Sequence, residues 1–595
     1  MKLSRIYPNK KENFSPVDFQ DGLNIVLAQR MIDNAHNLGK STLGELIDFC
    51  LLRDVDAKFF LIREAIFKDF VFFLEIKLDE NQYITIRRSV ENNSKVYLNF
   101  HKERYQDFSG LEDEAWSQPN VAFKKAKEIL SLHLQWDINE PGGYRKLLHY
   151  VIRRQDDYVD VAKVASLAQG KHKYWKPFVA GILGFNDEQI LELYEKREEE
   201  TQNIAYLESY REIIKTEKAN EENVFYERLK EINDEIAQLS ESIKSLNFVV
   251  IQNKEQEKKL GFLQSEILNV QKRLYTLKAE AKQINDSLDT NVEKSKINEM
   301  KTLFEEVKVN FPDSLAKDFS DLLKFRKSIT KERDFYLRQA LQEINKDIDS
   351  YNSILIELER QYNETADFIR ENGVNEKCTK ATQKIVQLQI ESVEIQNKLV
   401  YIEKKKEKED AEKKIKTDID SLKAAVNQDV RKQNSDKESL YSLIRSDFSD
   451  FINQVLGKTA RFSVSANREG NLEFETVFIT DNGKPTLEDY GSSFRKIMCV
   501  AFDLAVLKSH IETKFPRFVY HDGIFESIDD NIKYRLRDKL YEYSRLGIQQ
   551  IVTLINSDIP NGNTPEDFFK DKGHIILRLH DSEDDSGRLF RKMRY

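Results

Sequence analysis

The sequence contains little cysteine. Its three cysteines lie far apart, at Cys50, Cys378 and Cys499, and no two of them form a Cys-x-x-Cys pair. This spacing argues against a disulfide scaffold and against a tetrahedral zinc site. It fits a protein that works in a reducing compartment, and we expect a cytoplasmic location.

Long hydrophobic runs are also lacking. No stretch approaches the about 20 consecutive apolar residues that a membrane-spanning helix needs, and the N-terminus has no signal-peptide core. We therefore expect a soluble protein with no membrane partner. The formal net charge of −9 does not indicate a chain that is basic throughout, so a nucleic-acid site would have to be a local patch.

Proline and glycine are scarce, whereas charged residues are abundant. The 595 residues include only 10 Pro and 20 Gly, and 33% of them are Asp, Glu, Lys or Arg. Such a composition favours long charged helices over loop-rich domains. A chain of this length is also too long for one hydrophobic core, so we expect several domains or a long extension.

A phosphate-binding loop is the most informative motif. Residues 34–41, Asn-Ala-His-Asn-Leu-Gly-Lys-Ser, lie between an apolar strand at 23–28 and an apolar helix. In such a loop the backbone N–H groups surround phosphates, the lysine reaches the outer phosphate oxygens, and the serine hydroxyl ligates Mg²⁺. Asn replaces the first glycine of the pattern, and Asn tolerates the left-handed conformation better than most residues. The predicted phosphate contacts are Asn34, Asn37, Gly39, Lys40, Ser41 and Thr42, with the metal on Ser41.

Heptads dominate the chain from about residue 188 to 440. Apolar residues alternate in spacings of three and four, which indicates left-handed coiled coils, in four runs: 225–246, 260–277, 337–358 and 385–402. Breaks at 309–314 and 370–375 interrupt the pattern. Either break could be the point at which the chain reverses to form an antiparallel hairpin.

The segments on both sides of the heptads have mixed α/β patterns. The first contains strand-like runs at 70–77, 83–88 and 95–100. The second contains strand-like runs at 462–465, 472–479, 518–521 and 550–555, with an apolar helix at 497–507. We therefore divide the chain into residues 1–187, 188–440 and 441–595.

This order of parts resembles the SMC-like ABC ATPases, the family that includes condensin and cohesin subunits and RecN. The resemblance implies an α/β fold in which the N- and C-terminal halves form one ABC-type P-loop ATPase head, split by a long antiparallel coiled coil. The first half would carry Walker A and the Q-loop, and the second half the signature, Walker B and the D-loop. ATP and Mg²⁺ would be the cofactors, and the heads would form a homodimer.

The resemblance assigns Walker B to residues 518–522, with Asp522 as a second metal contact. Gly523 stands where the family has its catalytic glutamate. Two nearby residues are candidates to replace that glutamate, Glu526 and His521. The alternative is a nearly inert site that binds ATP and hydrolyses it slowly, so the sequence leaves the ATPase activity open.

Further nucleotide contacts follow from the same resemblance. Ser527-Ile-Asp529 is similar to the D-loop, and residues 490–494 take the place of the signature. The switch histidine is absent, and Asn556 or Ser557 occupies its place. The Q-loop candidate would also contact the metal. The nucleotide-binding residues added in this way are Gln155, Gly491, Ser492, Ser493, Asp529 and Ser557.

Basic residues gather near the predicted junction of head and coil. They would contact DNA phosphates without reading the base sequence, and they are Arg145, Lys146, Arg153, Arg154, Lys171, Lys173 and Lys176. The alternative is a solvated basic surface that offsets nearby acids.

The motif set resembles a divergent prokaryotic branch of the family, whose members are components of multi-gene anti-phage systems such as the Lamassu-type complexes. It implies an ATPase that senses or clamps double-stranded DNA and controls a nuclease-type effector together with accessory subunits. The alternatives are a DNA-repair ATPase of the RecN kind and a structural scaffold that binds ATP with little hydrolysis.

Overall fold

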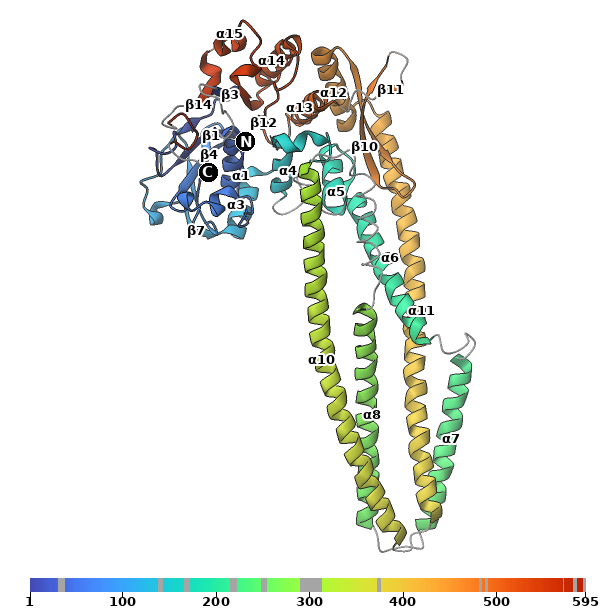
Figure 1. Ribbon diagram of the computed structural model, residues 1–595. Coiled ribbons are helices and arrows are strands. Elements are labelled where there is room, and N and C mark those ends of the chain that lie inside the picture. The colour runs from blue at the N-terminus through green and yellow to red at the C-terminus, as the bar shows by residue number, and fades with distance from the viewer. Residues whose placement is uncertain are drawn as a thin grey trace. The chain divides into compact units, whose positions relative to one another are not determined.

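The structure is a computed structural model, shown in Figure 1. It describes residues 1–29, 38–136, 143–164, 172–214, 222–247, 254–288, 313–371, 376–480, 484–486, 491–570, 572–581 and 586–591. The chain divides into two compact units. We call Met1–Glu198 with Thr417–Tyr595 the head unit, and Glu199–Lys416 the coil unit.

A five-stranded parallel sheet in the head unit takes its strands from both ends of the chain. Their order is β14 (Ile575–His580), β3 (Leu23–Gln29), β13 (Gln549–Ile555), β12 (Phe518–Asp522) and β8 (Ile152–Arg153). All four neighbouring pairs are parallel. Strands β3, β12 and β13 are buried along almost their whole length, as is usual for a parallel sheet covered on both faces.

An antiparallel sheet occupies another part of the head unit. Its order is β2 (Val17–Asp18), β1 (Lys2–Pro8), β4 (Val71–Asp79), β5 (Gln82–Ser89), β6 (Lys95–His101) and β7 (Gln118–Ala122). The runs of alternating or continuous apolar residues predicted β4, β5 and β6 to within a few residues. The remaining strands lack such a run and were not predicted.

A third sheet follows the coil in sequence and packs with two helices. It consists of β11 (Pro485–Thr486), β10 (Leu472–Ile479) and β9 (Thr459–Ala466). Helix α12 (Leu440–Leu456) packs on β9 and on α13 (Ser492–Ser509). The Ser439 hydroxyl caps α12 by accepting the Ser442 N–H, and Gly457 ends the helix with a φ of 67°.

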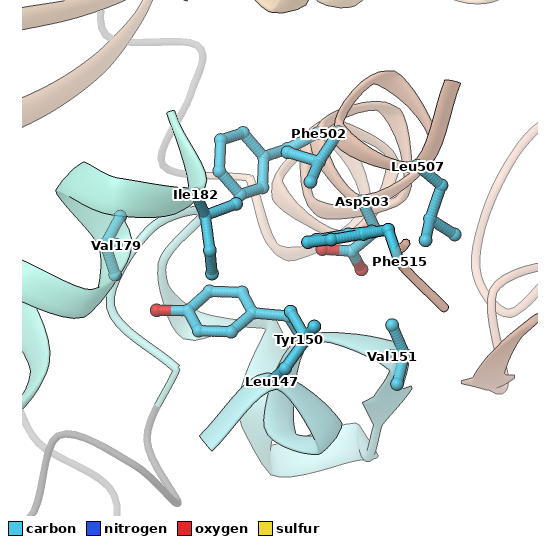
Figure 2. A pocket seen from close by; sticks show the side chains of 10 residues that line it. Leu147, Tyr150, Val151, Val179, Ile182, Phe502, Asp503, Leu507 and Phe515 are labelled. Carbon is cyan, nitrogen blue, oxygen red and sulfur yellow. The ribbon is translucent and has the colours of Figure 1, made fainter. Parts of the chain in front are cut away.

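Short helices complete the head unit. They are α1 (Lys40–Cys50), α2 (Phe60–Arg63), α3 (Phe123–Leu134), α4 (Tyr144–Val151), α5 (His172–Ile182), α14 (Asp530–Arg545) and α15 (Pro565–Phe569). Helices α4, α5 and α13 enclose an apolar cavity that Tyr150, Phe502 and Asp503 help to line (Figure 2). Its volume is about 10 Å³, which is about the room of one water molecule and far too small for a nucleotide.

The coil unit consists of paired helices, and the predicted heptad runs face one another. Helix α7 (Glu222–Asn247) packs on α11 (Glu376–Ser435) through a buried cluster that contains Ile232, Leu388 and Ile395. Helix α8 (Lys254–Leu288) packs on α10 (Asp313–Glu371) through Leu263, Ile267 and Tyr362. The structure thus confirms the coiled coil (Figure 1).

Two ion pairs give the relative direction of α7 and α11. Glu222 pairs with Lys406 and Arg228 pairs with Glu391, so α7 and α11 run antiparallel. The α8–α10 pair lies between them in sequence, so the two pairs are nested. Of the two predicted breaks, 309–314 lies mostly outside the described residues, and Asp313 is already in α10. The break at 370–375 separates α10 from α11, and 372–375 also lie outside the described residues.

Helix α6 (Asp187–Ile214) begins where the coil was expected to begin, and α12 begins where it was expected to end. The boundaries of the two units instead fall within α6 and α11. Among the helices that the structure describes, none is both long and apolar enough to cross a membrane.

Candidate nucleotide-binding site

Helix α1 begins at Lys40, directly after the phosphate-binding loop. Asn34 and Asn37 lie outside the described residues, whereas Gly39, Lys40, Ser41 and Thr42 lie within them. Gly39 has a φ of 98°, and a Cβ added to it would lie 2.5 Å from the Cβ of Leu589. The backbone N–H of Leu589 donates to the Leu38 carbonyl at 3.0 Å. Glycine at position 39 is therefore required both by the backbone conformation and by the close approach of the C-terminal segment.

A hydroxyl and a carboxylate meet below the loop. Ser41 Oγ donates to Asp522 Oδ2 at 2.5 Å, and the Thr553 hydroxyl donates to the other oxygen of Asp522. Two ligands on adjacent vertices of a Mg²⁺ octahedron lie about 3 Å apart, because each is about 2.1 Å from the ion. Ser41 and Asp522 therefore fit the binding of one Mg²⁺ ion with little movement.

Tyr520 fixes α1 against the Walker B strand. Its hydroxyl donates to the Lys40 carbonyl at 2.6 Å. A Cβ on Gly44 would lie 2.7 Å from the Tyr520 ring, so only glycine allows the helix to come this close. This contact sets the position of Lys40 and Ser41 relative to Asp522.

Glu526 is the carboxylate at which several site residues converge. Its Oε1 lies 4.0 Å from Lys40 Nζ and accepts a hydrogen bond from Gln155 Nε2 at 3.2 Å. Its Oε2 accepts one from Lys496 Nζ at 3.2 Å, and that lysine also donates to the Gly523 carbonyl at 2.7 Å. The Q-loop candidate thus contacts Glu526 in this structure, and its contact with a metal stays a prediction.

The backbone at Gly523 explains why Glu526 can occupy this position. Gly523 has a φ of 67°, and a Cβ added to it would lie 2.6 Å from Glu526 Oε1. The Glu526 carboxylate therefore fills the space into which a side chain at position 523 would project. A residue one turn along the chain thus brings its carboxylate next to the Gly523 backbone.

His521 does not lie in the site. Successive side chains of a strand point to opposite faces of the sheet, so His521 points away from the face where Asp522 meets Ser41. It is fully buried, and its Nε2 lies 3.1 Å from Asp503 Oδ2. Burial lowers the pKa of His521. This position contradicts the predicted catalytic role of His521.

A buried ion pair lies beneath the site and joins three elements. Arg153 of β8 donates to both oxygens of Asp503 of α13, from Nε at 2.7 Å and from Nη2 at 2.6 Å. The remaining guanidinium N–H groups donate to backbone carbonyls, among them that of Asp157 at 2.9 Å. With His521 of β12 as the third partner, the pair connects β8, α13 and β12.

The signature and D-loop candidates meet at the surface of the head unit. Gly491 is exposed and precedes α13, and Ser493 Oγ donates to the Ser527 carbonyl at 2.8 Å. The side chain of Ser492 is outside the described part of the structure. Asp529 is exposed and precedes α14. Gly491 and Asp529 thus directly precede the first turns of α13 and α14.

The switch segment forms a short 3-10 helix, Asn556–Asp558, after β13. Ser557 is exposed, whereas Asp558 is buried and accepts the Ile555 N–H at 2.9 Å. Burial raises the pKa of Asp558, and the nearby Glu526 carboxylate raises it further. Asp558 thus lies near the site, although the sequence had pointed to its neighbours.

Most of the basic residues predicted to contact DNA have partners within the head unit. Arg153 is fully buried in its ion pair, and Lys176 is buried and donates to the Leu472 carbonyl at 2.6 Å, so both positions contradict a role in DNA contact. Lys173 pairs with Glu198 at 2.9 Å. Lys146 lies over the Phe178 ring, and Lys171 is outside the described residues.

Two further members of that cluster share one carboxylate. Arg145 and Arg154 each lie 2.6 Å from an oxygen of Asp48, which is buried in α1. Burial alone would raise the pKa of Asp48, but Arg145, Arg154 and Arg53 outweigh it and lower this pKa to about 2. The two arginines therefore connect α1 to the Q-loop segment, and their contact with DNA stays a prediction.

Sequence reasoning missed Lys496 and Thr553 as well as Asp558. Thr553 lies opposite Asp522 in the pairing of β12 and β13, so an alignment of the two predicted strands could have found it. Lys496 lies within an apolar helix and belongs to no motif, and only the folded arrangement reveals its contact with Glu526.

Comparisons with known proteins complete the description. Residues 449–594 match a family described as an uncharacterised protein conserved in bacteria, DUF2326. No curated protein matches the chain.

Solved structures of SMC heads are similar to the chain. The Smc head domain with a coiled coil and joint from Pyrococcus yayanosii has 15% identity and a TM-score of 0.36, with 97% of this chain and 94% of that chain covered. The Smc head from Pyrococcus furiosus with an extended coiled coil, bound to the C-terminal domain of ScpA, has 12% identity and a TM-score of 0.36, with 94% and 90% covered.

Proposed function

We propose that the chain is an SMC-like ABC ATPase whose head unit binds ATP and Mg²⁺. The observation that carries this proposal is the convergence of Lys40 and Ser41, from the first half of the chain, with Asp522 and Glu526, from the second half. Each side chain has the chemistry that its position requires. The order of the parallel strands, in which the loop strand β3 lies next to β13 and then β12, supports the same conclusion.

The roles follow from the contacts. The phosphate chain lies over the start of α1, where backbone N–H groups and the helix dipole favour anions. Lys40 contacts the outer phosphate. This phosphate replaces Glu526 as the negative charge beside the lysine. Ser41 and Asp522 hold Mg²⁺, which supplies positive charge that offsets the charge of the phosphates. Thr553 keeps the Asp522 carboxylate in position.

Glu526 takes the role of the missing Walker B glutamate. Its carboxylate lies 4.0 Å from Lys40 Nζ, so it is within reach of a water molecule beside the outer phosphate. It would orient that water and accept its proton, while Lys496 and Gln155 fix the direction of the carboxylate. This arrangement is possible because Gly523 has no side chain and the Glu526 carboxylate fills the space beside it.

The proposed activity of the whole protein follows from a second head that completes this nucleotide site. Gly491, Ser493 and Asp529 act across a homodimer interface and complete the site of a second head. ATP binding joins the heads, and its hydrolysis separates them, so that the coiled coil converts head closure into movement. We propose that this cycle senses or clamps double-stranded DNA and controls a nuclease-type effector, with accessory subunits, in anti-phage defence.

A structural scaffold that binds ATP without appreciable hydrolysis is the second candidate. The observation in its favour is that Glu526 is paired with Lys496 at 3.2 Å and bonded to Gln155, which would restrain a base. DNA repair of the RecN kind remains the alternative cellular role for an active ATPase.

Nucleotide binding by the Lys40→Ala variant tests the proposal. We expect the variant to lose ATP affinity, because the loop lysine is the main cation that faces the phosphates. Lys102→Ala, a change at an exposed lysine in the antiparallel sheet region, is the control and should bind ATP as the wild type does. Steady-state turnover of the wild type, with and without linear and closed-circular DNA, then separates the sensor from the scaffold. Unchanged ATP affinity in Lys40→Ala would contradict the nucleotide site.

A further inference from the structure

A basic groove lies between the start of α12 and strand β9 in the head unit. Its volume is about 510 Å³, and it is open to solvent. Three of its lining residues are cations, Lys437, Arg445 and Arg461. None of them belongs to the basic cluster that the sequence suggested, and the groove has no part in the nucleotide site described above.

The other polar residues of the groove are hydroxyls. They are Ser442, Ser446, Ser449 and Thr459. The lining contains no carboxylate and no aromatic ring. Two of these hydroxyls, those of Ser442 and Ser449, already donate to backbone carbonyls. The three cations are therefore the main groups that can contact phosphate oxygens, and no carboxylate of the lining competes with them. The lack of a ring removes the means to stack on bases.

The cations differ in how firmly they are placed. Arg445 is half-buried, with its guanidinium 5.3 Å from the centre of the Tyr441 ring and Nη1 3.4 Å from Asn434 Oδ1. Lys437 and Arg461 are exposed, and neither forms an ion pair with any residue that the structure describes. Arg445 thus gives the groove a fixed positive charge, whereas the other two can adjust to a ligand.

The cations of the predicted DNA-binding cluster are less available to a ligand, because carboxylates already pair with several of them. Arg145 and Arg154 are paired with Asp48, and Lys173 is paired with Glu198. A ligand phosphate would have to displace a carboxylate at each of these positions. At the groove no such carboxylate has to be displaced, so the same number of contacts would give a larger gain in binding free energy.

We propose that this groove binds the phosphodiester backbone of DNA, and that it is the DNA contact of the head unit. The inference rests on the proposed function, which supplies DNA as the polyanion. Contacts of this kind position the duplex without reading its sequence, since phosphates are common to all sequences. They therefore suit a protein that senses the presence of DNA and does not select a site on it.

The test is a salt titration of DNA affinity with the full-length chain and a linear duplex. The Lys437→Ala/Arg461→Ala double variant removes the two adjustable cations. The matched control is Arg468→Ala/Lys484→Ala, which removes two exposed cations of the same sheet region that do not line the groove. ATP affinity and tryptophan fluorescence are measured for every protein, to show that the nucleotide site and the fold are intact.

Each phosphate contact adds about 0.9 to the slope of log affinity against log salt. We therefore expect the double variant to bind DNA more weakly, with a slope reduced by about 1.8, while the control and the wild type agree. A double variant with the affinity and slope of the wild type would overturn the inference and leave the proposed ATPase unaffected. A wild-type chain that binds no DNA at low salt would overturn both this inference and the proposed DNA function, whereas ATP binding through Lys40 would stand.

Discussion

Replacing Asp503 with Asn tests whether the buried ion pair stabilises the head unit. The side chains of Arg153 and Asp503 are 0% and 1% exposed, and Asp503 accepts two of the guanidinium hydrogen bonds. The Asn side chain has nearly the same shape but carries no charge, so the guanidinium stays buried without a counter-ion. Removing one partner of a buried pair costs about 3–5 kcal/mol.

Urea denaturation followed by tryptophan fluorescence measures this effect. The three tryptophans, Trp116, Trp136 and Trp175, are all buried in the head unit, so the signal reports on the head and not on the coil. With a slope of roughly 2–3 kcal/mol per molar urea, the expected loss lowers the midpoint by about 1–2 M.

Asp447→Asn provides the control. Asp447 of α12 forms a partly exposed ion pair with Lys508, which lies on α13 as Asp503 does. Pairs of this kind contribute about 1 kcal/mol or less, so the midpoint should move little. If Asp503→Asn shifted the midpoint no more than Asp447→Asn does, the ion pair would not stabilise the head in the way that we infer.

Two further predictions concern the site and its support. Gly523→Ala should reduce ATP turnover, because the new Cβ displaces the Glu526 carboxylate. The control is Gly547→Ala, where φ is 89° and no atom lies within 4 Å of the added Cβ. This control should bring only backbone strain of about 1–2 kcal/mol and leave turnover unchanged. Equal turnover in the two variants would contradict the contact. Asp48→Asn should destabilise the head by about 2–3 kcal/mol at pH 7, because the folded pKa of Asp48 is lowered to about 2 from an ordinary value near 4. A lowered carboxyl pKa stabilises the fold at pH values above the unfolded pKa, and this stabilisation is lost as the pH falls through the folded pKa. The difference in unfolding free energy between the variant and the wild type, measured by urea denaturation, should therefore fall to about half at pH 3. A difference that is the same at both pH values would rule out this electrostatic origin.

The sequence predicted the elements whose patterns are periodic or continuous. The heptad runs predicted coiled-coil helices over α7, α8, α10 and α11, because a sustained 3.5-residue repeat of apolar residues is specific to helices that supercoil around one another. They did not predict which of these helices pair. The apolar runs predicted β3, β4, β5, β6, β9, β10, β12 and β13. The short strands β2, β8 and β11 contain too few residues to show any pattern, and only the pairing with neighbours defines them.

Charged residues were the part of the site that sequence patterns could not place. Arg153 and Lys176 have the composition of a DNA-binding cluster, yet the fold buries both, since a buried cation is acceptable where partners satisfy it. The role of His521 is decided by the face of the sheet to which its side chain points. That face depends on the register of β12, which the sequence does not give. Conversely, Lys437 and Arg461 are ordinary charged residues in the sequence and form a groove only through the packing of α12 on β9.

The most direct test of the central claim is the steady-state ATP turnover of Glu526→Gln, measured together with ATP affinity. Gln keeps the size of the side chain and one of its two acceptor oxygens, but it cannot accept the proton. We expect ATP affinity to be retained and turnover to fall by a factor of about 100 or more, which is the usual contribution of a general base. Turnover equal to that of the wild type, with ATP bound as before, would show that Glu526 does not take the place of the missing Walker B glutamate.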